Sequence, residues 1–444
     1  MKTFVSCGRL FTGCDDDAVA GQSLVFDEEG VIAYVGAEAN APQRRRNDRT
    51  LDYSSPFVMP GLIDVHTHLA YGNAKSEEDI DLYSPLEFRA LRGMFFAQKM
   101  AAAGFTALCS PGDAGQISLS IRNAIRAGLF DGPRVMAAGR YVTTHQGLTD
   151  WYPTWIGAPE TSIGKLVTTT AEAIEEIRRQ VKDGVDCIKI ALDGIQRRDN
   201  GELVAAFTED ETNAMVRETH RLGKKVVVHA RGREATLYAA RAGVDLIFHG
   251  NHLDDECIAA MLETGSALCP TLTQPKNVIE FTQPHEPAGQ KGRPAAAKRE
   301  YEIGCANWKK ARAAGVPMMT GTDTGFAVTP YGEWNARELE LFIDDLGFTP
   351  AAALRAATEV NARFMTESDR IGVLEPGRLA DFVALDFSPL SDIGLLQDRS
   401  RIRAVRIAGK KFEVQDRGYD PRKVTDFALT NWTDLYTRDK VAEL

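Results

Sequence analysis

Two histidines one residue apart, His66 and His68, follow an apolar run that begins Val58-Met-Pro-Gly-Leu-Ile-Asp. Side chains along a strand alternate between its two faces, so these two imidazoles would point the same way. Two imidazoles on one face of a strand end can bind one metal ion. The alternative is a pair of polar residues with no ligand, but further histidines along the chain favour a metal site.

Other polar residues occupy comparable places in the middle of the chain. His229, His249 and Asp323 each end an apolar run, and Lys189 interrupts another, Cys187-Ile-Lys-Ile-Ala-Leu192. A lysine inside a buried strand is costly as an ammonium. One interpretation is a side chain that reaches out to the surface. The other is an amine that loses its proton and adds carbon dioxide, because the resulting anionic carbamate can bridge two divalent metal ions.

The elements that must position these residues alternate between strand and helix. The predicted strands are 62–68, 106–109, 134–142, 187–192, 225–229, 246–249, 267–272 and 317–322, and the predicted helices are 85–103, 117–127, 172–182, 209–222, 234–242, 254–263, 295–314 and 333–346. A further helix is expected near 350–363. Eight strand-helix units predict an α/β fold of the (β/α)8 barrel type, whose active site lies at the carboxyl ends of the strands.

Both ends of the chain are β-rich instead. The predicted strands there are 3–7, 23–26, 31–35, 380–386, 402–407 and 410–414. We therefore predict a small β-sandwich built from both termini. The predicted domains are residues 1–57 and 371–444 for the sandwich and tail, and residues 58–370 for the barrel.

Composition limits the classes of protein to consider. The 444 residues carry a net charge of −10 and the pI is near 5.5, which argues against a nucleic-acid-binding surface. The seven cysteines are scattered, as expected of reduced thiols in a cytoplasmic protein. Neither a signal peptide nor a run of about 18 apolar residues is evident, so no membrane association is expected.

The polar strand-end residues together resemble a known metal set. His66-Thr-His68, Lys189, His229, His249 and Asp323 are similar to the metal ligands of the amidohydrolase superfamily. Gly372-Val-Leu-Glu-Pro-Gly-Arg-Leu-Ala-Asp381 and Thr358-Glu-Val-Asn-Ala-Arg363 also match that superfamily. Gly132-Pro-Arg-Val135 and Thr144-His-Gln-Gly147 resemble the imidazolonepropionase-like and Xaa-Pro dipeptidase branch, which includes enzymes of the ochratoxin-amidase and phenylurea-hydrolase type.

This resemblance implies a role for each residue. His66, His68 and Asp323 would hold one metal ion, His229 and His249 a second, and Lys189, as its carbamate, would bridge the two. Zinc suits such ligands best, although cobalt or manganese would also bind. Bound metal lowers the pKa of water, and Asp323 would carry a proton from that water to the leaving nitrogen. Catalytic roles are therefore expected for Asp323 and Lys189, in a homo-oligomer that acts on a small molecule.

Several reactions agree with this set of residues. The first is hydrolysis of an amide C–N bond in an N-acyl amino acid, an ochratoxin-like amide or a dipeptide, and the alternative is a carbamate or aryl urea. A deaminase or cyclic amidase of the superfamily is a further alternative, but deaminases usually lack the lysine ligand of Lys189. A non-enzymatic scaffold would not need the complete ligand set.

The residues expected to contact substrate differ from those of relatives. Arg231 stands where the dipeptidases often have tyrosine, and it would face an anionic substrate group or pair with a carboxylate. His145 and His252 are further candidates, although each also suits an ordinary loop or helix start. The loop 147–157 carries Trp151 and Trp155, which would line the site or pack elsewhere. As an apolar wall, this loop would select an aromatic or bulky apolar group.

Overall fold

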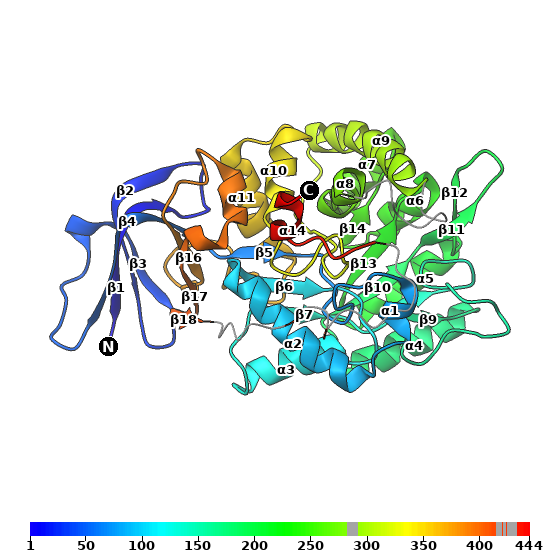
Figure 1. Ribbon diagram of the computed structural model, residues 1–444, viewed down its shortest axis with the longest axis horizontal. Coiled ribbons are helices and arrows are strands. Elements are labelled where there is room, and N and C mark those ends of the chain that lie inside the picture. The colour runs from blue at the N-terminus through cyan, green and yellow to red at the C-terminus, as the bar shows by residue number, and fades with distance from the viewer. Residues whose placement is uncertain (282–291, 414–419, 421–422, 424–432) are drawn as a thin grey trace.

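The chain divides visibly into a β-rich part and a larger part in which helices surround strands (Figure 1). The computed structural model describes residues 1–444 except 282–291, 414–419, 421–422 and 424–432. Within the described residues, no helix combines the length and the apolar character that crossing a bilayer requires.

One seven-stranded sheet takes strands from both ends of the chain. Its strands are β1 (Thr3–Phe11), β2 (Ala18–Phe26), β3 (Ile32–Ala37), β4 (Arg49–Pro60), β16 (Phe382–Leu385), β17 (Ile402–Ile407) and β18 (Lys410–Phe412), in the order β18-β17-β16-β4-β1-β2-β3. β4 pairs in parallel with β1 and antiparallel with β16, and so joins the two ends. The union of the termini in one β unit is confirmed, whereas its form as a sandwich stays a prediction. Val414, the end of the last predicted strand, lies outside the described residues.

The larger part contains parallel strands in two ladders. β5 (Leu62–Asp64), β6 (Phe105–Ser110) and β7 (Arg134–Ala137) form one. The other has the order β15-β14-β13-β10-β8-β9 and comprises β8 (Tyr141–Thr143), β9 (Gly164–Leu166), β10 (Cys187–Ala191), β13 (Lys225–Ala230), β14 (Leu246–His249) and β15 (Ala267–Cys269). A separate hairpin, β11 (Asp193–Arg197) with β12 (Leu203–Ala205), extends from the surface (Figure 1). Parallel strands covered by helices establish the predicted α/β class.

The helices cover these strands. They are α1 (Glu77–Asp81), α2 (Leu86–Ala102), α3 (Ile117–Arg126), α4 (Thr170–Asp183), α5 (Glu209–Arg221), α6 (Arg233–Ala242), α7 (Asp255–Thr264), α8 (Thr273–Phe281), α9 (Arg293–Ala314), α10 (Arg337–Asp344), α11 (Pro350–Arg355), α12 (Asn361–Phe364) and α14 (Arg438–Ala442), with a π-helical turn at Ala356–Val360 and 3₁₀ turns at Glu38–Asn40, Ile393–Gln397 and Arg399–Arg401. Local sequence sets their limits. Thr208 and Glu211 form a capping box at the start of α5, and Gly184 ends α4 in the left-handed conformation. The predicted helices are confirmed, whereas α1, α8 and α14 were not predicted.

Two predicted strands differ in the structure. The strand expected at 134–142 is split into β7 and β8, because the backbone between them bonds to other partners: Gly139 O accepts from Asp113 N, and Arg140 O accepts from the Gln180 side chain. The strand expected at 317–322 forms only an isolated bridge from Met318 to Leu268.

Side chains add to the few backbone bonds that the segment 317–322 makes with Leu268 and Val65. Asn361 bonds both backbone groups of Thr320, at 3.0 and 2.8 Å, and the Asp64 carboxylate accepts from Thr322 N at 3.2 Å. The strand ladders therefore do not themselves close a ring, and the eight-stranded barrel stays a prediction. The predicted division at residues 57 and 371 also stays a prediction, and β4 crosses the first of these positions.

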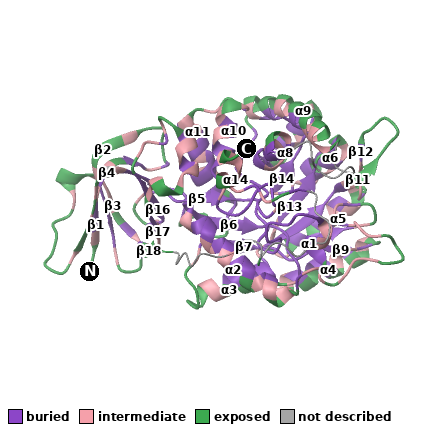
Figure 2. Cartoon of the chain, in the orientation of Figure 1, coloured by how far each residue is buried: buried purple, intermediate pink, exposed green. Residues whose placement is uncertain are grey.

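The parallel strands form the centre of the core. Their side chains are buried almost throughout (Figure 2), and Val226, Val227 and Val228 of β13 are fully buried. Such continuous apolar runs are typical of strands covered on both faces. They make the polar residues at the strand ends conspicuous.

Candidate metal centre

Two of the predicted ligands have an unusual backbone conformation at the point where the chain leaves the core. His249 ends β14 with a φ of 74°, and Asp323 has a φ of 54°. Non-glycine residues in this region cost of order 1–3 kcal/mol and persist where surrounding contacts impose them. Trp308 Nε1 donates to His249 O at 2.6 Å, and Asp323 N donates to His66 O at 2.8 Å. Contacts within the fold therefore hold both residues at the strand ends in a backbone conformation that non-glycine residues disfavour.

The first group brings together His66, His68 and Asp323. Asp323 Oδ1 lies 3.0 Å from His68 Nε2 and 3.5 Å from His66 Nε2. His68 Nδ1 lies 2.8 Å from Gly112 O, and His66 Nδ1 lies 2.9 Å from Thr271 Oγ1. A carbonyl only accepts, so Nδ1 of His68 carries the proton and Nε2 is the nitrogen with a lone pair for a ligand. The outer contacts thus orient both imidazoles with Nε2 toward Asp323.

The second group contains His229 and His249, whose ring centroids are 4.6 Å apart. His229 Nε2 faces Asp193 Oδ1 at 3.3 Å, which leaves Nδ1 as the nitrogen available to a ligand. The other oxygen of Asp193 accepts from Arg231 N and Gly232 N at 2.8 and 2.7 Å. These two bonds fix the carboxylate that orients the His229 ring.

Lys189 lines the same cavity as members of both groups and is fully buried. Its Nζ has no hydrogen-bond partner among the described residues. It lies 3.9 Å from the centroid of the Phe248 ring. Burial lowers the pKa of this amine to about 7. A buried, unpartnered amine is unusual in a folded protein and indicates that its native partner is a group from outside the chain.

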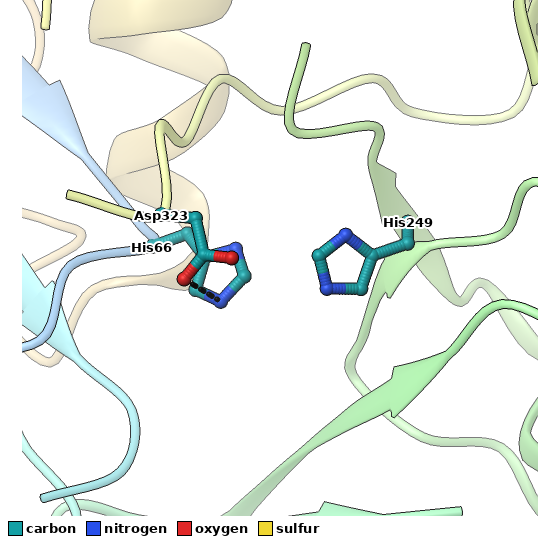
Figure 3. Close-up of side chains that lie close together, drawn as sticks. All are labelled: His66, His249 and Asp323. Atoms are coloured by element: carbon teal, nitrogen blue, oxygen red, sulfur yellow. Dashed lines mark ion pairs between the residues drawn. The ribbon is translucent and has the colours of Figure 1, made fainter. Parts of the chain in front are cut away.

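The chemistry of these side chains fits divalent metal ions. Burial holds the pKa of His66 and of His249 well below the usual range, and it also lowers the pKa of His229, so these imidazoles are neutral ligands. Burial acts to raise the pKa of Asp323, but its contact with His68 and the nearby Lys189 and Arg231 outweigh burial and leave a lowered pKa. One ligand atom from each of His66, His249 and Asp323 lies within 4.8 Å of the others (Figure 3). Neutral imidazoles and an ionised carboxylate are ligands that zinc prefers.

Asp64 connects the two segments that carry the first group. Its carboxylate accepts from His66 N at 3.0 Å, from Thr322 Oγ1 at 2.6 Å and from Asn335 Nδ2 at 2.9 Å. Burial raises the pKa of Asp64 to about 6. This residue therefore ties the end of β5 to the segment that carries Asp323.

A cavity of about 80 Å³ opens over the strand ends. Five of the six predicted ligands line it, namely His66, Lys189, His229, His249 and Asp323. Of the predicted substrate contacts, Trp151 and Arg231 line it too. A neighbouring cavity of about 270 Å³ shares Arg231, His249 and Gln274 with the first. A substrate larger than a few water molecules would therefore extend from one cavity into the other.

The structure does not bring the other three predicted contacts to this cavity. Trp155 is 85% exposed. His145 is half exposed and lies 3.6 Å from Asp150 of its own loop. His252 bonds Glu300 at 2.8 Å and lines a separate surface groove. The structure therefore places these three residues away from this cavity, and their role as substrate contacts stays a prediction.

Several cavity residues were not identified from the sequence. Tyr71 and Tyr141 line the cavity. Asp193 and Thr271 contact the ligands His229 and His66. Asp193 had a signal, since it is a carboxylate directly after the strand of Lys189. The tyrosines had none, because a tyrosine in an apolar run is ordinary core composition.

Fold and site together indicate an α/β protein with a candidate metal centre. Comparisons with known proteins place it more closely. A model of the Amidohydrolase family matches residues 57–412, so the chain belongs to that family. Ochratoxinase of Aspergillus niger is 27% identical over 433 residues, which cover 93% of this chain and 86% of that protein. Imidazolonepropionase of Cupriavidus necator is 27% identical over 395 residues, covering 82% of this chain and 84% of that protein.

Solved structures agree with this placement. A Xaa-Pro dipeptidase with bound methionine in its active site superposes with a TM-score of 0.81 at 28% identity, over 93% of this chain and 100% of that one. The branch predicted from the sequence motifs is confirmed. The protein is a hydrolase acting on carbon–nitrogen bonds.

Proposed function

We propose that this protein is a binuclear amidohydrolase that cleaves an amide bond beside an aromatic or bulky apolar group. The observation that carries the proposal is the convergence of two imidazole groups and Asp323 around one buried, unpartnered lysine amine. His66, His68 and Asp323 would hold one metal ion, and His229 and His249 the other. Lys189 as its carbamate would bridge them. Zinc is the metal that these ligands favour, and the ligands would lie at the strand ends of a closed (β/α)8 barrel.

In the proposed reaction, Asp323 transfers the proton. When bound, the metal ions lower the pKa of water and polarise the carbonyl. Asp323 accepts the proton of the attacking water as the new C–O bond forms. It then gives that proton to the nitrogen as the C–N bond breaks. Oδ1 of Asp323 faces the two imidazoles, and Oδ2 has no partner in the described part of the chain, which leaves Oδ2 to carry the proton.

The cavity supports an aromatic substrate with an anionic group. Trp151, Phe326, Ile80 and Ile163 form an apolar wall over the metal ligands. Arg231 lines both cavities, and its guanidinium makes no ion pair with the residues described. We propose that it binds a carboxylate of the substrate. N-acyl aromatic amino acids, ochratoxin-like amides and dipeptides would satisfy both features.

Metal analysis with a substrate screen tests the proposal. We expect about two metal ions per chain and hydrolysis of N-acyl aromatic amino acids in preference to glycyl dipeptides. Lys189→Ala should bind about one ion and lose turnover. Lys165→Ala is the matched control, because Lys165 also lies in a strand but is only half buried. A wild-type content of one ion that Lys189→Ala leaves unchanged would refute the binuclear centre. Preference for a carbamate or aryl urea would refute the amide.

A further inference from the structure

Two buried tyrosines form part of the cavity wall next to the first metal-ligand group. Tyr71 follows β5 by a few residues, and Tyr141 begins β8. They are 3% and 2% exposed, both line the cavity, and their hydroxyl oxygens are 2.9 Å apart. The Tyr141 hydroxyl also lies 3.1 Å from His68 Nε2. Neither residue is a metal ligand, so the proposed reaction leaves both hydroxyls without a role.

The packing around Tyr71 fixes its place. Its ring stacks on His68 with centroids 4.3 Å apart, and Phe326 contacts it edge-on at 5.2 Å. In the described part of the chain, the Tyr141 oxygen is the hydrogen-bond partner recorded for the Tyr71 hydroxyl. A buried hydroxyl donates where an acceptor lies in reach. Either hydroxyl can be the donor in this bond. We assign Tyr71 as the donor, which directs the Tyr141 proton elsewhere.

His68 Nε2, 3.1 Å from the Tyr141 hydroxyl, can accept that proton only while its lone pair is free. Gly112 O holds the proton on His68 Nδ1, so Nε2 is the ligand nitrogen of this ring. A nitrogen that serves as a metal ligand cannot also accept from Tyr141. The Tyr141 O–H is then left to donate to an oxygen atom of whatever occupies the cavity.

We propose that Tyr141 is a further catalytic residue, whose phenol stabilises the carbonyl oxygen of the scissile amide, and that Tyr71 is the positioning residue that holds it. This inference rests on the proposed function. As water bonds to the carbonyl carbon, the C=O π pair moves onto the oxygen, and the Tyr141 O–H donates to that negative charge. When this electron pair re-forms the C=O bond, the C–N bond breaks and the nitrogen takes its proton from Asp323. Tyr141 keeps its own proton throughout.

Tyr141→Phe tests the donor directly. Loss of one donor to a developing oxyanion typically costs about 100-fold or more in kcat. We expect that loss in kcat with KM within about threefold of wild type, because the bond strengthens only in the transition state. Binding of a phosphonate analogue of the tetrahedral intermediate, measured by calorimetry, should weaken about 100-fold as well. Metal content should equal that of the wild type.

Two further variants complete the test. Tyr71→Phe keeps the Tyr141 phenol and should lower kcat about tenfold. This variant tests the proposal even if Tyr141→Phe does not fold. Tyr238→Phe is the control, because its hydroxyl bonds Glu234 on α6 in a separate surface groove. It should change neither rate nor phosphonate binding.

The outcomes separate this inference from the proposed function. A wild-type protein without metal or without amide hydrolysis would refute the proposed function. An active wild type whose Tyr141→Phe form keeps both its kcat and its affinity for the phosphonate would refute the role of Tyr141 alone. A loss of metal in Tyr141→Phe that matches the loss of rate would also overturn it, since Tyr141 would then only support His68.

Discussion

The Asp323 carboxylate lies at the junction of metal binding and proton transfer. Oδ1 is directed at His66 and His68, and the backbone of the residue is held at a positive φ. A change in this side chain would therefore affect both metal binding and proton transfer. A suitable substitution can separate the two functions.

Asp323→Asn is the substitution that separates them. Asparagine keeps the shape and one oxygen for a metal ion, but it cannot shuttle a proton. We expect the thermal midpoint of unfolding to stay near that of the wild type while kcat falls about 10²–10⁴-fold. Differential scanning calorimetry and steady-state kinetics measure the two quantities. Turnover within a few fold of wild type would remove Asp323 as the proton carrier.

The sequence was informative for the ligands and less so for the residues around them. His66, His229, His249 and Lys189 were recognisable because a polar residue stands out against a buried apolar strand. The roles of Asp193 and Tyr141 depend on which ring nitrogen of a neighbouring histidine is held, and that follows from three-dimensional contacts. Periodicity along the chain carries no such information.

At the scale of elements, the loop 147–157 covers the cavity with only part of its aromatic content. Trp151 lines the cavity, whereas Trp155 is 85% exposed. Loops have no periodic burial pattern, so the sequence could not distinguish the two tryptophans. Parallel strands and their helices, in contrast, were predicted closely because both have a periodic burial pattern.

The two tryptophans give a matched pair of substitutions. Trp151→Ala removes an aromatic wall and should raise KM for an N-acyl aromatic amino acid about tenfold or more, since burying an aromatic ring is worth a few kcal/mol. Metal content should not change. Trp155→Ala should leave KM at the wild-type value, because the side chain does not reach the cavity. Equal effects of the two substitutions, or none from Trp151→Ala, would contradict the proposed wall.

At the scale of the whole molecule, side-chain hydrogen bonds hold the segment at which the strand ladders do not close a ring. Asn361 and Asp64 bond the segment 320–322 where strand pairing was predicted. Hydrophobic periodicity could not reveal this, because an apolar segment bonded by side chains has the same pattern as a strand. The predicted homo-oligomer also remains to be measured, for example by light scattering.

Ion pairs of Arg134 are among the contacts that join the seven-stranded sheet to the α/β part. Arg134, at the start of β7, donates to Asp381 before β16 at 2.7 and 3.2 Å, and to Glu367 at 2.9 Å. Asp381 is 4% exposed and also accepts from Ala408 N at 2.6 Å. Two motifs singled out in the sequence, Gly132–Val135 and Gly372–Asp381, therefore meet at this contact.

Arg134→Met should weaken the contact between the seven-stranded sheet and the α/β part without changing catalysis. The substitution keeps an apolar stem but leaves Asp381 as a buried carboxylate without its cation, and breaking such a pair costs about 3 kcal/mol. We expect unfolding at lower urea concentration, with metal content and kcat near wild-type values because Arg134 does not line the cavity. Arg126→Met is the matched control, since Arg126 is exposed on α3 and makes no ion pair with the described residues. If both variants unfold at the wild-type urea concentration, the ion pairs contribute nothing to the union. If Arg134→Met loses metal in the folded state, the sheet and the metal centre are coupled more tightly than these contacts indicate.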